Sequence, residues 1–457
     1  MIKKVLIANR GEIAVRVIRA CREMGIETVA VYSTADADAL HTQLADEAVC
    51  IGPPAPADSY LNPYNILSAA SITGADAVHP GYGFLSENSK FVRMCNKSNV
   101  TFIGPDAESM EKMGDKLMAR KIMREADVPV IPGSEGALAD VREAKKCAGE
   151  VGYPVMIKAA HGGGGRGIRK VLSEEEMAQA FDSAQKEALG AFGDGTLYME
   201  KCIEDARHIE VQILCDNYGK AVYLFERECS LQRRNQKVME EAPSVALTKL
   251  ARREMGQAAV RAAKASGYKS AGTIEFLLDS TGRYYFMELN ARVQVEHPVT
   301  EMVTGIDIVR EQILIAGGGK LSFGQEHVKL NGCAIECRIN AEDPSRNFMP
   351  SIGKINVLHF PGGPGVRFDT AMYTDYKIPP QYDSMIGKLI VHAPTRDKAM
   401  AKMRAALTEL VVDGVDTNAD FQLLLLSDED VRAGKLDTGL VGRIMERYEK
   451  KYGGTRE

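Results

Sequence analysis

Two glutamates in a predicted β-hairpin could hold a divalent cation. A two-residue turn at Thr281-Gly282 would place Glu275 directly opposite Glu288, with Cβ atoms about 5 Å apart. Two ionised carboxylates at that distance repel each other by roughly 3 kcal/mol at an effective dielectric constant of about 20, so the pair requires a proton or a cation. A slipped turn would separate the carboxylates. The interpretation as a metal site therefore depends on the register of this hairpin.

The second strand of the hairpin continues with polar side chains on one face. They are Glu288, Asn290, Arg292, Gln294 and Glu296, and they alternate with apolar residues. Asn290 adds an oxygen ligand that suits Mg²⁺ or Mn²⁺. Arg292 between two carboxylates suggests a site for a small anion. Glu296, where the following His297-Pro298 predicts an extended backbone, is the candidate general base. The alternative is a solvent-exposed strand face, which periodicity alone favours.

A glycine-rich loop follows another predicted strand. Lys158 ends the strand 153–158, and glycines occupy positions 162–165 and 167. Glycines let backbone N–H groups approach an anion and Lys158 adds a positive charge, so we interpret the loop as a flap over nucleotide phosphates. The Walker A pattern is absent. A flexible surface hairpin is the alternative.

Three further segments leave two interpretations open. The loop 79–88, with Gly81 and Gly83, either presents a ligand or only forms a turn. The segment 199–203 is either a strand that contacts the edge of an adenine or an ordinary edge strand. The charged run 233–241 is either a solvated surface or part of a site.

The order of the predicted strands and helices indicates a doubly wound α/β domain at the N-terminus. Residues 4–8 and 27–32 are typical of strands, and 12–24 of a helix. Further strands are predicted at 75–79 and 100–103. The first turn lacks G-x-G-x-x-G, so a dinucleotide site has little support.

Breaks in the pattern predict three domains, as expected for a chain of 457 residues. A junction near 112 separates the N-terminal domain, 1–112, from a central domain of strands, a glycine loop and helices, 113–320. The run A-G-G-G-K near 320 marks the next break, and a third domain is expected over 330–446.

The composition indicates a soluble protein that does not bind nucleic acid. The net charge is −5, and acidic and basic residues are interspersed. The nine cysteines are an odd number with no CxxC pair, so a reducing, cytoplasmic compartment is expected. Cys333 and Cys337 lie in a predicted strand and are interpreted as core residues. Neither a signal peptide nor a membrane span is predicted.

Several strings together resemble the biotin carboxylase subunit of biotin-dependent carboxylases, an ATP-grasp family, over nearly the whole chain. The strings are I-A-N-R-G-E-I-A (7–14), H-P-G-Y-G-F-L-S-E-N (79–88), M-G-D-K (113–116), G-G-G-G-R-G (162–167), Q-V-E-H-P-V-T-E (294–301), E-C-R-I-N-A-E-D-P (336–344) and Y-D-S-M-I-G-K-L (382–389). The resemblance implies α/β and α+β architecture: an N-terminal doubly wound (Rossmann-like) domain, an ATP-grasp domain with a mobile lid at about 131–203, and a C-terminal biotin carboxylase domain.

The resemblance also implies which residues bind ATP and the metal. The ATP-binding set is Lys116, Lys158, Gly162, Gly163, Gly164, Gly165, Glu200, Lys201, Ile203, His208, Gln232, Asn235 and Leu277. Glu275, Glu288 and Asn290 are implied to hold Mg²⁺ or Mn²⁺, with two ions expected. Two departures stand out: Asn235 replaces a histidine expected near the ribose, and His161 departs from the usual residue at the flap hinge.

The second implied set faces bicarbonate and biotin. It comprises Tyr82, Lys237, Arg292, Gln294, Val295, Glu296 and Arg338, of which Lys237, Arg292, Glu296 and Arg338 are implied to be catalytic. In the family scheme Glu296 removes the proton of bicarbonate, which attacks the γ-phosphate to give carboxyphosphate. Arg338 then stabilises the biotin enolate that attacks CO₂, and the enzyme is a ligase that forms a C–N bond. A fixed guanidinium suits an oxyanion.

The resemblance implies several partners. No E-A-M-K-M biotinylation string is found, so biotin is expected on a separate biotin carboxyl carrier protein. Separate carboxyltransferase subunits would choose the final acceptor: acetyl-CoA, as in fatty acid biosynthesis, another acyl-CoA, or pyruvate. A homodimer is also implied.

Two alternative functions have less support. An ATP-grasp ligase acting on a free small molecule, such as a purine precursor or carbamate, would not account for the strings at 294–301 and 336–344. A non-catalytic nucleotide-sensing module would be expected to have lost site residues that are all present here.

Overall fold

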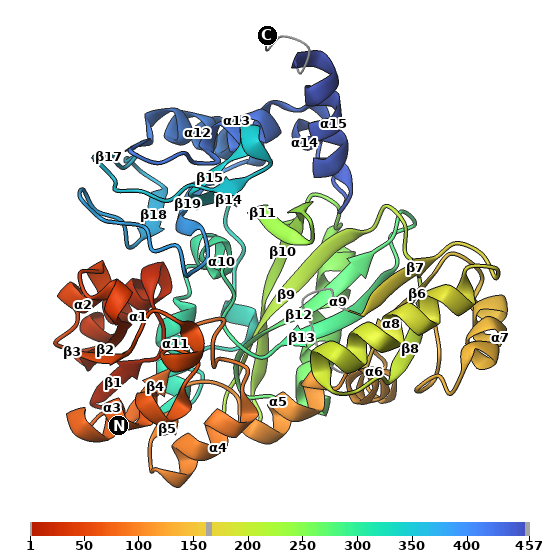
Figure 1. Ribbon diagram of the computed structural model, residues 1–457, viewed down its shortest axis with the longest axis horizontal. Helices are drawn as coiled ribbons and strands as arrows, with labels where there is room; N and C mark the ends of the chain where they lie inside the picture. The colour runs from red at the N-terminus through yellow and green to blue at the C-terminus, as the bar shows by residue number, and fades with distance from the viewer. Residues whose placement is uncertain (1, 161–166, 453–457) are drawn as a thin grey trace.

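The structure is a computed structural model that describes residues 2–160 and 167–452 (Figure 1). The glycines predicted at 162–165, and His161, lie outside the described residues. Figure 1 shows the N-terminal part at the lower left, a long sheet through the middle, a small sheet with two helices at the right, and the C-terminal part at the top.

The N-terminal part folds around a five-stranded parallel sheet. Four of its strands were predicted from the sequence, and the strand at 47–52 was not. The strands are β1 (Lys4–Ile7), β2 (Glu27–Ser33), β3 (Glu47–Gly52), β4 (Ala77–His79) and β5 (Thr101–Phe102). The helices are α1 (Gly11–Glu23), α2 (Leu40–Leu44), α3 (Pro63–Thr73), α4 (Ser89–Lys97) and α5 (Ala107–Gly114). In the order β3-β2-β1-β4-β5 the direction of winding reverses between β1 and β4. Open α/β sheets bind ligands beyond the strand ends at such a point.

The loops that leave β1 and β4 are joined at this point. The Asn9 side-chain amide donates to the carbonyl oxygens of Pro80 and Tyr82, each at 2.7 Å. Gly81 and Gly83 have φ values of 60° and 68°, so both glycines have a role in the turn. The loop 79–88 is therefore held against the start of α1.

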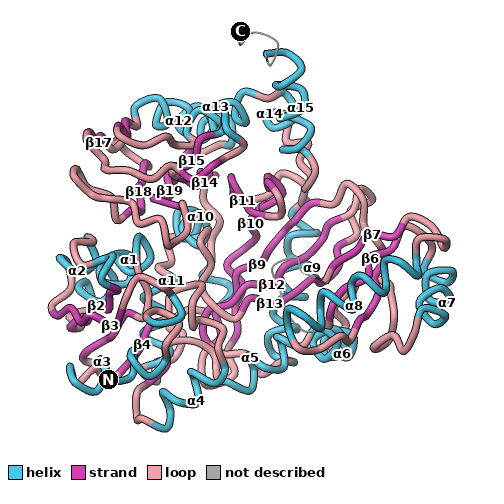
Figure 2. Tube along the Cα trace, in the orientation of Figure 1, coloured by secondary structure: helices cyan, strands magenta, loops and turns pink. Residues whose placement is uncertain are grey.

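An eight-stranded antiparallel sheet runs through the middle of the molecule, as Figure 2 shows. Its order is β13-β12-β9-β10-β11-β14-β19-β18. The strands are β9 (Arg207–Cys215), β10 (Ala221–Arg233), β11 (Gln236–Ala242), β12 (Ser270–Leu278), β13 (Tyr284–Asn290), β14 (Cys333–Asn340), β18 (Val366–Thr370) and β19 (Met385–Ala393). The accompanying helices are α6 (Lys116–Glu125), α9 (Lys249–Ala265), α10 (His297–Thr304) and α11 (Ile308–Ala316). Because β11 pairs with β14, the C-terminal strands extend the central sheet without a break.

A three-stranded sheet with its own apolar core lies beside the central sheet (Figure 1). Its order is β7-β6-β8, from β6 (Val155–Ala159), β7 (Ile168–Val171) and β8 (Leu197–Lys201). It packs with α7 (Val141–Val151) and α8 (Met177–Phe192). A β-bridge between Gly133 and Glu200 joins the edge strand β8 to the segment that enters this unit.

The C-terminal part packs helices against β14 and β19. They are α12 (Arg396–Glu409), α13 (Ala419–Ser427), α14 (Glu429–Arg432) and α15 (Leu440–Tyr452). Short strands complete it: β15 (Glu342–Asp343), β16 (Met349–Pro350), β17 (Val357–His359) and β20 (Val411–Asp413). Cys333 and Cys337 are buried in β14, which confirms their interpretation as core residues. All nine cysteines lie among the described residues, and none forms a disulfide. Among the described helices, none has the length and apolar character needed to span a bilayer.

Candidate active site

The β12–β13 hairpin places Glu275 directly opposite Glu288, so the predicted opposition of the two carboxylates is confirmed. The predicted two-residue turn is wrong. Asp279 pairs with Arg283 through a backbone hydrogen bond of 2.8 Å, and a β-bulge next to Glu275 compensates for the longer loop. The Asp279 carboxylate stabilises this loop because it accepts hydrogen bonds from the backbone N–H groups of Thr281 and Arg283 at 2.9 and 3.0 Å.

The alternation predicted beyond Asn290 does not hold, because β13 ends at that residue. The next residues form a turn, and α10 begins at His297. The extended backbone predicted before Pro298 is also wrong. A proline fits the first turn of a helix, where its missing N–H would have no intrahelical acceptor. The polar side chains are nevertheless inside: Gln294 and Glu296 are each 2% exposed, so the solvent-exposed alternative fails.

The turn after β13 brings three amide and carboxylate groups together. Asn290 and Gln294 each donate a side-chain hydrogen bond of 2.9 Å to the same oxygen of Glu275. Arg292 contacts the Asn290 side-chain oxygen at 3.0 Å and the Glu87 carboxylate at 3.1 Å. The turn therefore returns to the hairpin and encloses one Glu275 oxygen.

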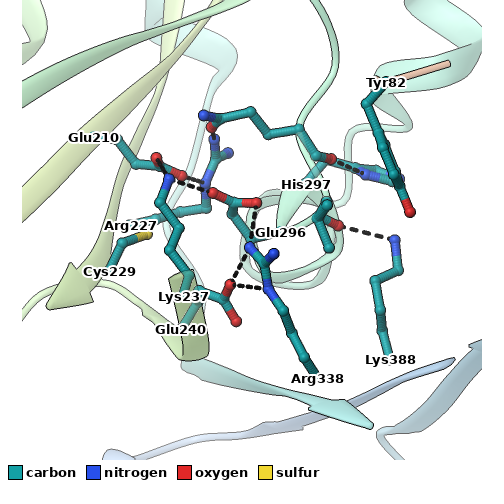
Figure 3. A network of polar contacts seen from close by, with 12 residues as sticks. Tyr82, Glu210, Arg227, Cys229, Lys237, Glu240, Glu296, His297, Arg338 and Lys388 are labelled. Atoms are coloured by element: carbon teal, nitrogen blue, oxygen red, sulfur yellow. Dashed lines mark hydrogen bonds and ion pairs between the residues drawn. The ribbon is translucent and has the colours of Figure 1, made fainter. Parts of the chain in front are cut away.

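Lys237 lies at the centre of three carboxylates, two of which, Glu210 and Glu296, are seen in Figure 3. Its Nζ lies 2.6 Å from Glu210, 3.1 Å from Glu275 and 2.6 Å from Glu296. Burial lowers the pKa of Lys237, but the carboxylates outweigh burial and raise the pKa well above its usual value. Burial likewise raises the pKa of Glu296, yet Lys237 and Arg338 hold it well below the usual range. The charged run 233–241 is therefore divided: Arg234 is exposed in the turn between β10 and β11, whereas Lys237 and Glu240 belong to the site.

Arg338 extends this cluster from β14. Its guanidinium donates to Glu240 at 2.6 Å and to Glu296 at 3.0 Å. Burial raises the pKa of Glu240 to about 7, with Arg338 opposing and Glu296 adding to the rise. Glu296 therefore lies between two cations, Lys237 on one side and Arg338 on the other (Figure 3).

The arginine behind this cluster is not among the residues predicted for the site. Arg227 is fully buried, and its N–H groups donate to five side chains. The acceptors are Glu210, Gln212, Thr273, Gln294 and Thr300. Arg227 thereby orients the Gln294 amide and one of the carboxylates that hold Lys237. The sequence gives little signal for this role, because Arg227 stands between two glutamates in its strand and its partners come from four other segments.

A second group of the predicted residues gathers beside the hairpin. Lys158 donates to Glu200 at 2.5 Å, and Arg120 contacts the other oxygen of Glu200. Burial lowers the pKa of Lys116 at the start of α6, although the nearby Glu288 opposes this effect. Lys116 and Lys158 are both half-buried and place positive charge beside the hairpin, which suits phosphates.

His208 connects these groups to the hairpin. It lies 3.0 Å from Glu275 and 2.8 Å from the Gln232 amide. Burial lowers the pKa of His208, but Glu275 outweighs burial and the pKa is raised. Leu277 pairs with His208 across β12 and β9 and is half-buried.

Three of the predicted nucleotide-binding residues are not joined to this network. Lys201 donates instead to the backbone carbonyls of Gly152 and Tyr153 at 2.8 and 2.9 Å. Ile203 is half-buried in the loop after β8. Asn235 is exposed in the turn between β10 and β11, with a φ of 63°.

The oxygen ligands at the hairpin suit a divalent cation. Burial and the opposite carboxylate of Glu275 both raise the pKa of Glu288, so negative charge there lacks full compensation. Carboxylate and amide oxygens suit Mg²⁺ or Mn²⁺. A second possible set of metal ligands surrounds Lys237. Its members, His208, Glu210 and Glu275, offer ligand atoms within 4.8 Å of one another. In the described structure the Lys237 ammonium supplies the positive charge at that point.

Comparison with known proteins gives consistent matches along the chain. Residues 1–110 match the biotin carboxylase N-terminal domain, 115–323 the ATP-binding domain of the carbamoyl-phosphate synthase L chain, and 336–443 the biotin carboxylase C-terminal domain. Biotin carboxylase 1 of Bacillus subtilis is 58% identical over 450 residues, which cover 98% of this chain and 99% of that protein. The 2-oxoglutarate carboxylase small subunit of Hydrogenobacter thermophilus is 52% identical, covering 96% and 93% of the two chains.

Solved structures agree with these matches. A biotin carboxylase from Campylobacter jejuni, described as a βγ-ATP complex, has a TM-score of 0.94 and 52% identity, covering 97% of this chain and 99% of that one. The biotin carboxylase domain dimer of the H. thermophilus 2-oxoglutarate carboxylase, with MgADP, ADP and bicarbonate, has a TM-score of 0.93 and 51% identity, covering 98% of each chain. The chain therefore belongs to the biotin carboxylase family, whose members are ATP-dependent ligases that carboxylate biotin with bicarbonate.

Proposed function

We propose that Glu296 is the base that removes the proton of bicarbonate in this chain. The observation that carries the proposal is its burial between the cations of Lys237 and Arg338, at 2.6 and 3.0 Å. A carboxylate with so low a pKa is always ionised but is a weak base. When bicarbonate enters, Lys237 can turn toward its oxygens. Loss of that contact raises the basicity of Glu296 as the proton is transferred.

The proposal assigns the anion-binding side of the same site to Arg292, Gln294 and Val295. Arg292 contacts Glu87, a side chain 42% exposed, so its guanidinium can exchange this partner for an anion. Arg227 holds the oxygen end of the Gln294 amide at 2.7 Å, and the amide nitrogen donates to Glu275 with one of its two N–H groups, so the other can donate to an anion. Bicarbonate held by these groups would attack the γ-phosphate to give carboxyphosphate.

The nucleotide side of the proposal rests on the lysines near β8 and α6. Lys116 and Lys158 would hold the phosphates, with Glu200 orienting Lys158 through its 2.5 Å contact. His208, Gln232 and Leu277 would line the nucleotide pocket. Lys201, Ile203, Asn235 and the glycines 162–165 stay in the proposed nucleotide-binding set. Closure of the lid, at about 131–203, would bring Lys201 and Ile203 to ATP.

Glu275, Glu288 and Asn290 would hold Mg²⁺ or Mn²⁺ in this proposal, with two ions expected. The metal would neutralise phosphate charge when it is bound. Lys237 and the Asn290 amide both contact the same oxygen of Glu275, so a metal ion bound at that oxygen would displace Lys237 from it. The displacement would free the lysine for bicarbonate.

Arg338 and Tyr82 would face biotin. A guanidinium fixed by Glu240 can stabilise an enolate oxygen without reorganisation. The proposal includes a biotin carboxyl carrier protein, separate carboxyltransferase subunits, a homodimer and a cytoplasmic location. The final acceptor remains acetyl-CoA, another acyl-CoA or pyruvate.

The replacement Glu296→Gln tests the assignment. Loss of a positioned base reduces turnover by about 10²–10⁴-fold. Bicarbonate-dependent ATP cleavage with free biotin should therefore decrease by this factor, while the affinity for ATP is unchanged. Glu446→Gln on the exposed face of α15 is the matched control. Wild-type turnover in Glu296→Gln would refute the assigned base. If biotin did not affect ATP cleavage by the wild type, the proposed roles of Arg338 and Tyr82 in biotin binding would be contradicted.

A further inference from the structure

Lys388 in β19 is a buried lysine that the proposed mechanism does not use. The whole residue is 0% exposed. Its Nζ donates to the Val295 carbonyl oxygen at 2.9 Å and lies 3.1 Å from Glu12. Removing an ammonium from water is strongly unfavourable, so a lysine at this position requires compensating contacts.

The position of Lys388 follows from the pairing of β14 with β19. Lys388 pairs with Arg338 in this ladder, and opposed residues project from the same face of a sheet. The two cations then contact neighbouring residues of the turn before α10. Arg338 contacts the Glu296 carboxylate at 3.0 Å, and Lys388 contacts the peptide that joins Val295 to Glu296 (Figure 3).

A second set of contacts connects Lys388 to the N-terminal part. The Tyr82 hydroxyl donates to Glu12, on the same carboxylate oxygen that faces Lys388. The Lys388 Nζ also lies 6.0 Å from the centroid of the Tyr82 ring. Glu12 thus has one buried cation and one hydroxyl donor, and both come from segments that were singled out in the sequence, 382–389 and 79–88.

We infer that Lys388 is a positioning residue for the reaction, since one ammonium fixes the backbone that carries Glu296 and the ring of Tyr82. The inference rests on the proposed roles of these two residues. Without the lysine, the Val295 carbonyl loses its donor and the Glu12 carboxylate is buried without a cation. The turn and the ring then lose their common support, although every group proposed to contact a substrate is still present.

Two variants separate positioning from a merely structural charge. Lys388→Met removes the ammonium at similar volume, and it leaves Glu12 uncompensated, which is expected to lower the melting temperature. The double variant Glu12→Gln with Lys388→Met removes both charges and is compared with Glu12→Gln alone, so that only the lysine differs. Lys398→Met, at an exposed position on α12, is the matched control.

We expect the double variant to melt no lower than Glu12→Gln, in which Lys388 is buried without this carboxylate, but to have a lower kcat for biotin- and bicarbonate-dependent ATP cleavage, by on the order of 10²-fold with an unchanged KM for ATP. Lys388→Arg should retain part of the lost kcat. A double variant with the kcat of Glu12→Gln would overturn the inference, because charge balance alone would then explain Lys388.

A crystal structure of the double variant gives a reading that does not depend on activity. We expect the contact between Arg338 and Glu296, 3.0 Å here, to lengthen or break. An unchanged turn would count against positioning. Wild-type protein without biotin-dependent ATP cleavage would instead show that the proposed function is wrong, whatever the geometry of the variant.

Discussion

Replacing Glu288 by Gln should stabilise the metal-free protein and abolish its stabilisation by Mg²⁺. Glu288 lies opposite Glu275, and burial together with this neighbour raises its pKa. Two unit charges about 5 Å apart repel by roughly 3 kcal/mol at an effective dielectric constant of about 20. Lys237 and His208 already compensate Glu275, and Lys116 attracts Glu288. We therefore expect a net gain of about 1–2 kcal/mol in the free energy of unfolding.

The assay is thermal unfolding with and without Mg²⁺ and ATP. A ligand at 100 times its Kd adds about 2.7 kcal/mol to stability, so wild-type protein should melt higher in the presence of both. Without metal, Glu288→Gln should have a higher melting temperature than the wild type, and Mg²⁺ should raise its melting temperature by less. Glu446→Gln, exposed on α15, is the control. A variant that melts below the wild type without metal and keeps the full Mg²⁺ response would refute the argument from charge repulsion.

Three further predictions concern buried groups around the site. Arg227→Met should lower the free energy of unfolding by about 3–5 kcal/mol in urea titrations, because it leaves the partners of a buried cation unpaired. Burial raises the pKa of Asp369, but Arg367 at 2.6 Å outweighs burial and lowers it from 3.8 to about 2. The ionised carboxylate thus adds about 2 kcal/mol to the free energy of unfolding above pH 3.8, and this contribution is lost as the pH falls toward 2. Asp369→Asn should therefore flatten this part of the curve of stability against pH. In Gly133→Ala the new Cβ would overlap the backbone carbonyl of Met199, so calorimetry should show weaker ATP binding through displacement of β8.

Much of the architecture could be predicted from the sequence because its determinants are local. Strand, helix and strand over 4–32 follow from the spacing of apolar residues, and α1 buries Ile13, Val17 and Cys21 as that spacing requires. The opposition of Glu275 and Glu288 was also predicted, although through the wrong turn. A three-residue loop and a bulge shift the register in opposite directions, so the pairing survives the error.

The errors occurred where local rules have more than one solution. The polar alternation to Glu296 satisfied the period of a strand, but the chain leaves the sheet at Asn290 and starts a helix. His297-Pro298 fits both an extended dipeptide and the first turn of a helix. Only packing of α10 against its neighbours selects between them.

The sequence by itself determined the fold class, the hairpin that opposes two carboxylates and, through long matching strings, the family. It did not reveal the cluster around Lys237, where β11 brings the ammonium to carboxylates from β9, β12 and the turn before α10. Nor did it reveal Arg227 and Lys388, whose partners are far away in the chain. The physical reason is that a charge can be buried only where its counter-charges converge, and this convergence depends on strand order and register across the whole sheet.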